Sequence, residues 1–314
     1  MDVSVIMINY NTFDLTKDAL NSIFENTKDL KYEIILLDNN SPDGSGEKLN
    51  KMFGSRITYI QTGSNLGTSK AFNEGVSRAT GKYVLWLNTD ILLRENFIKT
   101  LFDYMESHPK CGICGGNVLD FDGNPTHSFR KKFPCLREER KNKSIIVAVY
   151  RKLFRKPFYD QYNYTNMPMR VGYITGADMM IRSSLFEKVG KFDADIFMYS
   201  EEVEFTWRAV TRTGMTVMAI PNAHIFHLEG ASFRTSADSF NEVRFTNGVK
   251  GSLLMYMKCY GETAAKKYLT ILKRSYLKFG VVSALLFMRQ KRKMYVKKRA
   301  IVKDLFHCFF GQSD

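Results

Sequence analysis

The chain is poor in proline and cysteine and lacks a long hydrophobic segment, with seven prolines and five cysteines in 314 residues. Its longest apolar run, Gly280–Phe287, is far shorter than the ~20 residues that span a bilayer. Residues 1–8 resemble a strand, without a basic leader or small-residue cleavage site, so we expect no export signal. An odd number of cysteines without that signal indicates reduced thiols. Cys111 and Cys114 form a C-x-x-C with no second pair, and their apolar surroundings favour a buried strand over a zinc or redox site.

Acidic residues are scarce at the C-terminal end. Residues 244–314 contain sixteen Lys/Arg and three Asp/Glu, a net charge of +13, whereas residues 1–243 carry only +1. A second basic cluster, residues 130–156, has eleven Lys/Arg and two Glu, a net +9. Such patches attract phosphates on lipids, nucleic acids or substrates, although each is also compatible with a solvated face. A non-enzymatic nucleic-acid-binding protein is one alternative, but there the charge is expected to spread over a nucleic-acid-binding fold. We therefore expect no nucleic-acid partner.

The first half of the chain alternates strands with helices. Apolar strands separated by helices indicate a parallel sheet covered on both faces, and ligands bind at the carboxyl ends of such strands. Residues 122–168 are expected to form a long irregular excursion. The expected strands are 3–8, 33–38, 57–60, 82–88, part of 171–181 and 215–220, the expected helices are 15–24, 69–79, 96–105, 183–189 and 201–212, and a basic helical region begins near residue 243.

Polar residues follow the first two expected strands. The first strand ends in Asn9-Tyr10-Asn11, and the second ends in Asp38-Asn39. A carboxylate in this position can accept the imide N–H of uracil or thymine. The alternative is a turn that favours Asp, Asn and Gly.

A third polar segment, residues 65–75, precedes an expected helix. Gly67 brings backbone N–H groups to the helix start, where a diphosphate can bind, and Lys70 adds a positive charge. The sequence contains neither G-x-G-x-x-G nor a P-loop pattern, which argues against dinucleotide binding and P-loop chemistry.

Candidate catalytic and metal-binding residues lie further along. Asp90 follows a hydrophobic strand, a suitable position for a hard cation, since Mg²⁺ takes one or two carboxylates plus phosphate oxygens; alternatively, Asp90 caps the helix near Glu95. Glu201, Glu202 and Glu204 crowd a helix start, which either stabilises the helix dipole or provides a general base. His224 and His227 follow a strand, and residues three apart on a strand face opposite sides, so they are not expected to bind one metal.

The order of these motifs carries a family resemblance. NYN, LDNNSPDGS, NLGTSKAFNEG, LNTD, GAD, GKFDADIFMYSEEVEF and HIFHLEGAS, within residues 3–235, resemble glycosyltransferase family 2, in particular its bacterial rhamnosyltransferase-like members. The resemblance implies a GT-A fold: an α/β, Rossmann-like nucleotide-binding mixed sheet flanked by helices, followed here by a basic helical extension. It further implies a transferase domain over 1–240, with a nucleotide-binding half (1–120) and an acceptor half (121–240), and a C-terminal region over 241–314.

The resemblance also implies residue roles. Glu202 corresponds to the base that deprotonates the acceptor hydroxyl, with Glu201 as the alternative, because the family usually has Asp there. Asp90 corresponds to a metal ligand for Mg²⁺ or Mn²⁺, joined by His227. The implied nucleotide-sugar site comprises Asn9, Tyr10, Asn11, Asp38, Asn39, Asn65, Gly67, Lys70, Asn88, Thr89, Asp90, Gly176, Ala177 and Asp178.

The expected activity is transfer of a sugar from a UDP- or dTDP-sugar to a glycan or lipid-linked acceptor, with inversion. A nucleotidyltransferase acting on sugar phosphates is the alternative, but no Gly-rich basic loop is found near residues 9–14. The basic segments also carry Leu, Phe, Tyr and Met at helical spacing, which predicts binding to an anionic membrane surface. We therefore expect a peripheral protein on the cytoplasmic face of the cell membrane, acting in surface polysaccharide synthesis. A helical layer packed on the body is the alternative for the tail.

Overall fold

The computed structural model describes residues 1–147, 161–228 and 240–311. The chain divides into two compact units, each described separately. The sheet unit comprises Met1–Phe133, Phe158–Phe197 and Glu201–Thr235. The helical unit comprises Pro134–Pro157, Met198–Ser200 and Ser236–Asp314. Two short segments from the middle of the chain therefore associate with the C-terminal helices.

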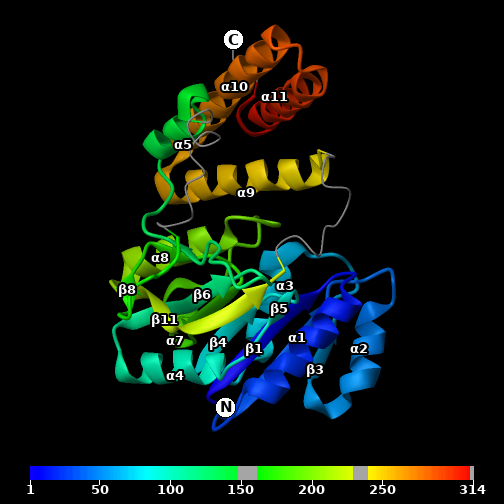
Figure 1. The fold of residues 1–314 in the computed structure, drawn as a ribbon, viewed down its shortest axis with the longest axis vertical. Helices are drawn as coiled ribbons and strands as arrows, with labels where there is room; N and C mark the ends of the chain where they lie inside the picture. Colours follow the sequence, from blue (N-terminus) through cyan, green and yellow to red (C-terminus); the bar gives the residue numbers. More distant parts are fainter. Residues whose placement is uncertain (148–160, 229–239, 312–314) are drawn as a thin grey trace. The chain divides into compact units, whose positions relative to one another are not determined.

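The sheet unit is built on a nine-stranded mixed sheet in the order β3-β2-β1-β4-β10-β6-β11-β5, with β8 also pairing with β11 (Figure 1). β1, β2, β3 and β4 are parallel, whereas β10 runs antiparallel to both β4 and β6. The predicted α/β mixed sheet flanked by helices is thus confirmed. The strands are β1 (Val3–Asn9), β2 (Tyr32–Asp38), β3 (Thr58–Gln61), β4 (Tyr83–Leu87), β5 (Ile91–Leu92), β6 (Cys111–Leu119), β8 (Met169–Arg170), β10 (Asp178–Arg182) and β11 (Thr216–His227), with β7 (Phe129–Arg130) and β9 (Tyr173–Ile174) forming a separate pair.

Helices cover both faces of the sheet because the parallel strands are apolar on both sides. One core packs side chains of α1, α2 and α4 against one face. The other core packs α3, α7 and α8 against the opposite face. The helices are α1 (Phe13–Asn26), α2 (Ser45–Phe53), α3 (Gly67–Arg78), α4 (Phe97–Ser107), α7 (Ser184–Val189) and α8 (Glu201–Thr213), with a 3₁₀ turn, η1, at Gly54–Arg56.

β11 differs from the strand predicted from the sequence, whereas β6 agrees with its prediction. The strand expected over 215–220 is β11, which continues through Pro221 to His227, with an irregular register against β6 between Ala219 and His224. A proline usually ends strand pairing, but the irregularity accommodates it. His224 and His227 therefore lie within the strand rather than after it. The Cys111 and Cys114 thiols are free and buried in β6, as predicted.

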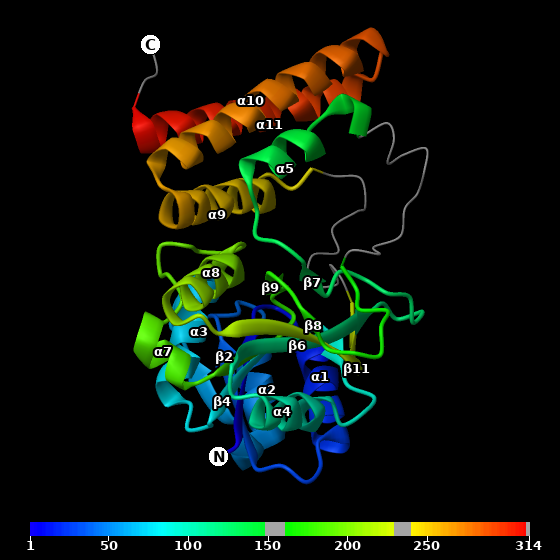
Figure 2. The same ribbon diagram turned by 90° about the vertical axis from the view of Figure 1, so that its left-hand side faces the viewer.

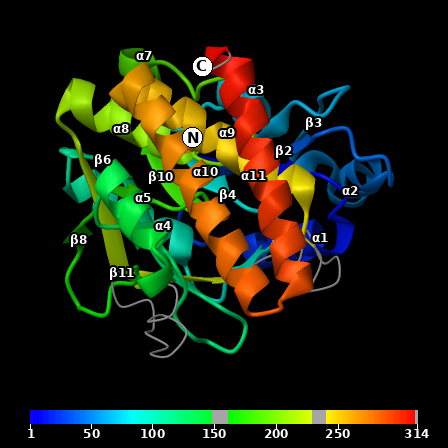
Figure 3. The same ribbon diagram turned by 90° about the horizontal axis from the view of Figure 1, so that it is seen from above.

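The helical unit contains α5 (Leu136–Asn142), α9 (Glu242–Tyr260), α10 (Glu262–Leu285) and α11 (Arg289–Phe310). α10 and α11 lie side by side as a hairpin, and α5 and α9 pack on α10 (Figures 2 and 3). α5 and β7 fall in the excursion expected to be irregular, and its residues 148–160 lie outside the described part of the chain. Among the described residues no helix is long and apolar enough to cross a bilayer.

Candidate active site

The carboxyl ends of β1 and β2 are joined by a buried hydrogen-bond network. Asn9 Nδ2 donates to Asp38 Oδ1 at 2.7 Å and to Ser45 Oγ at 2.8 Å. Asp38 also accepts the Ser41 backbone N–H and the Gln61 amide, at 3.0 and 3.1 Å. The Asn9 and Asp38 side chains are 0% and 1% exposed. Both predicted pyrimidine-binding side chains therefore hold the loop after β2 in place, and direct contact of Asp38 with a base would require this network to open.

A second network orders the predicted diphosphate loop. Asn39 Oδ1 accepts the Leu66 N–H at 2.9 Å, and Asn65 Oδ1 accepts the Gly67 N–H at 3.0 Å. The Thr68 N–H donates to Phe197 O at 2.7 Å. Gly67 has φ +73°, and a Cβ there would lie 2.3 Å from the same Phe197 oxygen, so only glycine fits. The first N–H groups of α3 are thus already bonded within the fold.

Four of the predicted nucleotide-sugar residues are open to solvent. Tyr10 is 43% exposed, and Asn11, Asn65 and Lys70 are also exposed. Asn11 has a positive φ, and its N–H donates to Ser41 Oγ at 3.0 Å, which fixes the turn after β1. These side chains, rather than the buried Asn9 and Asp38, are accessible to a ligand.

The structure brings the two predicted metal ligands together. His227, at the end of β11, places Nε2 3.0 Å from Asp90 Oδ1, and the Asn88 amide approaches the same nitrogen at 3.5 Å. The cause is the antiparallel pairing of His227 with Ile91 of β5, reinforced by the Leu228 N–H donating to Asp90 O. Thr89, the remaining residue of the motif, brings its hydroxyl 3.3 Å from that of Thr12, after β1.

The second histidine is engaged elsewhere. The His224 N–H and Nδ1 both contact Glu95 Oε1, at 2.6 and 3.2 Å. The expectation that His224 and His227 do not share one metal is consistent with these separate partners. Glu95 therefore has a role in fixing β11 that the sequence did not indicate.

Asp90 and His227 provide a carboxylate oxygen and an imidazole nitrogen side by side. Among the described residues no group of three or more His, Cys, Asp or Glu could hold a metal ion. Two protein ligands would leave the remaining coordination positions of an ion to substrate phosphates and water. The pair does not resemble a structural zinc site, which needs four protein ligands.

The predicted Gly176-Ala177-Asp178 segment lies beside this pair. The Asn88 N–H donates to Ala177 O at 3.1 Å, at the start of the β4–β10 pairing. Asp178 itself is 0% exposed. Its Oδ2 accepts the Gly116 N–H at 2.6 Å, and its Oδ1 has no hydrogen-bond partner among the described residues. Burial raises the pKa of the Asp178 carboxyl well above its usual range.

The acidic pair opens α8. Glu201 is 4% exposed, and its Oε2 has no hydrogen-bond partner in the described part of the chain. Burial, followed by the neighbouring Glu202 charge, raises the pKa of the Glu201 carboxyl well above its usual range. Glu202 is half-buried. Of the two, Glu202 is the more accessible to an acceptor hydroxyl.

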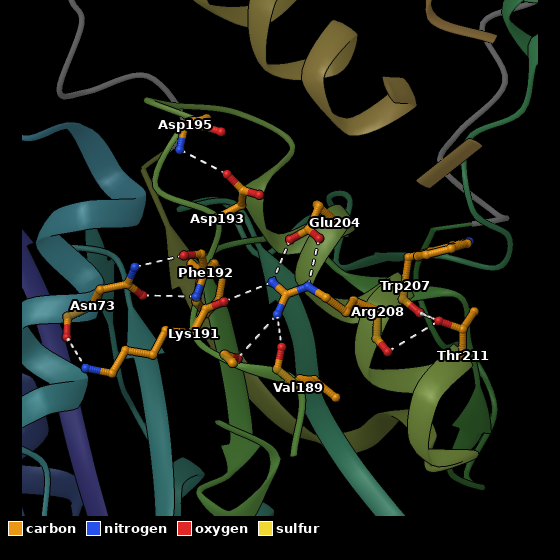
Figure 4. Close-up of polar contacts among 11 residues, drawn as sticks. Asn73, Val189, Lys191, Phe192, Asp193, Asp195, Glu204, Trp207, Arg208 and Thr211 are labelled. Carbon is orange, nitrogen blue, oxygen red and sulfur yellow. Dashed lines mark hydrogen bonds and ion pairs between the residues drawn. The ribbon is translucent and has the colours of Figure 1, made fainter. Parts of the chain in front are cut away.

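The third glutamate of the cluster is bound within the fold. Glu204 receives two hydrogen bonds from the Arg208 guanidinium, at 2.8 and 2.7 Å (Figure 4). Arg208 also donates to the carbonyls of Val189 and Lys191. This network ties α8 to the loop after α7. This network was not predicted from the sequence, although Glu and Arg four residues apart on a helix are a recognised pair.

The residues immediately before the acidic pair belong to the helical unit. Tyr199 and Ser200 have φ of 69° and 72°, which is strained for non-glycine residues. A Cβ on Gly251 of α9 would lie 2.1 Å from Tyr199 O. Ser200 Oγ lies 3.2 Å from Ser252 Oγ. α9 therefore holds the turn that leads into Glu201, a constraint with no signal in the sequence.

The chain is similar in sequence to known proteins. The family model described as Glycosyl transferase family 2 matches residues 4–190. An N-acetylglucosaminyl-diphospho-decaprenol L-rhamnosyltransferase of Mycobacterium tuberculosis is 25% identical over 209 residues, covering 62% of this chain and 66% of that protein. The putative teichuronic acid biosynthesis glycosyltransferase TuaG of Bacillus subtilis is 22% identical over 226 residues, covering 71% of this chain and 89% of that protein.

Two solved structures share the fold. GalNAc-T7 with UDP, GalNAc and Mn²⁺ gives a TM-score of 0.57 at 16% identity, covering 79% of this chain and 47% of that one. The mannosyltransferase PcManGT of Pyrobaculum calidifontis, with GDP-Man and Mn²⁺, gives 0.54 at 13% identity, covering 99% and 88%. The matched segment thus spans about two thirds of the mycobacterial relative and half of GalNAc-T7.

Proposed function

The chain belongs to glycosyl transferase family 2, and from this premise we propose that it is an inverting, metal-dependent transferase that moves a hexosyl or deoxyhexosyl group from a nucleoside-diphosphate sugar to an acceptor hydroxyl. The observation that carries the proposal is the pairing of Asp90 and His227 at 3.0 Å, across 137 residues of sequence. This pair lies beside the polar ends of β1, β2 and β4, where α/β folds bind nucleotides.

In the proposed reaction, Glu202 takes the proton of the acceptor hydroxyl. The acceptor oxygen attacks the anomeric carbon opposite the leaving group, one C–O bond forms, and the bond to the diphosphate breaks with its electron pair. This single displacement inverts the anomeric centre. Asp90 and His227 would hold a Mg²⁺ or Mn²⁺ ion, which would supply positive charge to stabilise the leaving diphosphate.

The nucleotide is proposed to be UDP or dTDP, held on the loops after β1 and β2. Tyr10 and Asn11 are the exposed groups there, and an exposed aromatic ring suits stacking on a base. Lys70, which is exposed on α3, is proposed to meet the phosphate charge. Four other predicted site residues are proposed to support these groups, because Asn9, Asp38, Asn39 and Asn65 are bonded to one another or to adjacent loop backbone.

A donor screen tests the proposed function. Incubation with Mn²⁺ and a panel of UDP-, dTDP- and GDP-sugars is expected to give slow release of the nucleoside diphosphate from a UDP- or dTDP-sugar, because water can replace the acceptor. Release is measured by a coupled nucleotide assay, with EDTA as the control. Faster release from GDP-sugars would refute the pyrimidine assignment. Failure to bind or hydrolyse any nucleotide sugar would refute the proposed function.

The acceptor is proposed to be a glycan or lipid-linked glycan in surface polysaccharide synthesis, reached from the cytoplasmic face of the membrane. The mycobacterial relative's name specifies a diphospho-decaprenol carrier, which supports the lipid-linked choice. Within the helical unit, the α10–α11 turn exposes Leu285, Leu286 and Phe287, at 72%, 62% and 90%. Arg289, Lys291, Arg292 and Lys293 follow this turn. Exposed apolar side chains beside cations are typical of membrane-interface binding.

We expect the intact protein to sediment with vesicles containing anionic lipid at low salt, and less at high salt. The variant Leu286→Ser/Phe287→Ser should bind such vesicles at least about tenfold more weakly, because each buried apolar side chain contributes ~1.5–3 kcal/mol. The control Met52→Ser/Met167→Ser removes exposed apolar side chains from the sheet unit, at 54% and 71% exposure. Equal binding by both variants would contradict the insertion of this turn.

A further inference from the structure

The helical unit contains a cavity of its own, separate from the residues assigned to the transfer reaction. Its volume is about 510 Å³, within the range of small-molecule sites. It is lined by residues of α9, α10 and α11, by the residue that follows α5, by the residues just before α9 and by the turn before α8. The lining residues are Lys143, Tyr199, Phe240, Asn241, Arg244, Phe245, Gly248, Val249, Tyr268, Leu272, Tyr276 and Lys298.

Three cations converge on this cavity from distant parts of the sequence. Lys143 follows α5, Arg244 lies in the first turn of α9, and Lys298 lies on α11. Among the described residues, no Asp or Glu lines the cavity. Glu242, in the same turn as Arg244, is paired with Lys297. Positive charge therefore exceeds negative charge at the cavity wall, which favours an anion.

Aromatic rings form the rest of the wall. Lys298 Nζ lies 5.2 and 5.3 Å from the ring centroids of Phe240 and Phe245, and Lys143 Nζ lies 5.8 Å from that of Tyr276. Burial, and then the nearby Lys143 charge, lower the pKa of the Lys298 ammonium. An anion placed between the two lysines would relieve their repulsion. Glu139 is the acidic group close by, and its charge helps burial to raise the pKa of Tyr276 to about 12.

The apolar surface continues along the hairpin. Tyr276 also lines a second cavity of about 370 Å³ between α10 and α11. Its apolar wall includes Leu277, Val281 and Val296, which are 46%, 51% and 60% exposed. Its cations are Arg292, Arg299 and Lys303. Further along α10 this surface leads to the exposed Leu285–Phe287 turn. The cationic, aromatic cavity and the largely apolar groove between α10 and α11 thus meet at Tyr276.

We propose that the helical unit binds a phosphate-bearing lipid, with the phosphate or diphosphate at Lys143, Arg244 and Lys298 and the hydrocarbon chain along Phe245, Tyr276 and the α10–α11 groove. The cations alone would bind any free phosphate, and the groove alone would bind any hydrocarbon chain. Their continuity selects a molecule that carries both. The binding site is independent of the transfer reaction; only the identification of this lipid with the acceptor's carrier rests on the proposed function.

Isothermal titration calorimetry of the full chain with farnesyl diphosphate, in EDTA to remove metal-dependent binding elsewhere, tests the proposal. Inorganic diphosphate and dimethylallyl diphosphate are the comparison ligands. Farnesyl diphosphate is expected to bind at least about tenfold more tightly than either, because its longer chain buries more apolar surface. Equal affinity for inorganic diphosphate would indicate a free-phosphate site and overturn the lipid assignment. No binding of farnesyl diphosphate would overturn the site.

Variants locate the binding. Lys143→Gln/Lys298→Gln removes two cavity charges and is expected to weaken farnesyl diphosphate binding at least about tenfold, since charge-assisted hydrogen bonds to the diphosphate would be lost. Lys250→Gln/Lys267→Gln removes the same charge from exposed positions of α9 and α10 and should leave binding unchanged. If the cavity variant unfolds at a lower temperature than wild type, Lys298→Gln alone is compared instead. Equal losses in the cavity and control variants would overturn the site.

Discussion

Replacing Glu202 by Gln is expected to reduce sugar transfer by ~10²–10⁴-fold, the usual contribution of a general base. The amide keeps the size of the side chain but cannot accept a proton. Donor binding should change little, because the proposed donor contacts lie on the loops after β1, β2 and β4. The measurements are single-turnover transfer, or donor hydrolysis where the acceptor is not in hand, together with calorimetric titration of the nucleoside diphosphate.

Glu201→Gln is the matched control. Glu201 is buried and one of its oxygens has no partner among the described residues. Since burial and the Glu202 charge raise its pKa, the neutral carboxyl is favoured, and Gln resembles that form in shape and charge. We expect the transfer rate of Glu201→Gln to stay within about tenfold of the wild-type rate. This reduction is smaller than the one expected when a general base is lost. An inactive Glu201→Gln beside a near-normal Glu202→Gln would reverse the assignment.

The contacts of the acidic cluster, Glu201, Glu202 and Glu204, could be predicted from the sequence only in part. Three glutamates at a helix start are expected to repel one another, and this suggested that their clustering serves a function. In the structure, Glu204 forms an ion pair with Arg208 one helical turn away. Only the carboxyls of Glu201 and Glu202 therefore still call for a functional explanation. The spacing of Glu204 and Arg208 was available in the sequence, whereas the carbonyls that accept hydrogen bonds from Arg208 come from the end of α7 and the loop after it and depend on the fold.

The parallel half of the sheet was predictable for a simple physical reason. β4 is apolar throughout, and β1 and β2 are apolar along most of their length; such strands need cover on both faces. The other half of the sheet was harder to predict, because β5 and β8 are two residues long and too short to show a hydrophobic period. The continuation of β11 through Pro221 runs against strand propensity and is permitted by its irregular register with β6.

The candidate site was predictable mainly through the family resemblance. Residue types placed Asp90 at a strand end, but they could not pair it with His227, because that contact depends on β11 reaching β5. Pattern reasoning treated Asn9 and Asp38 as ligand-binding groups, whereas their polar atoms are already used to hold the loop after β2. The strained Tyr199–Ser200 turn and its contact with Gly251 lack any sequence signal, since neither turn residue favours positive φ.

The second large effect is expected at Asp90. Asp90→Ala should lower the Mn²⁺-dependent affinity for the nucleoside diphosphate by at least about a hundredfold, the upper range for losing a residue that merely supports a metal ligand. Asp90→Asn tests charge separately from shape, because its amide oxygen can still accept a hydrogen bond from His227. If Asp90 binds the metal, the Asn variant should lose most of the metal-dependent affinity while keeping the wild-type melting temperature.

The control for this prediction lies on the same strand. His224 is on β11 like His227, but it contacts Glu95 rather than Asp90. His227→Ala should therefore weaken metal-dependent nucleotide binding, and His224→Ala should not. Calorimetric titration with and without Mn²⁺ measures both. Equal nucleotide affinity in the two conditions for the wild-type protein would remove the metal site from the mechanism and leave Lys70 as the proposed cationic contact to the diphosphate.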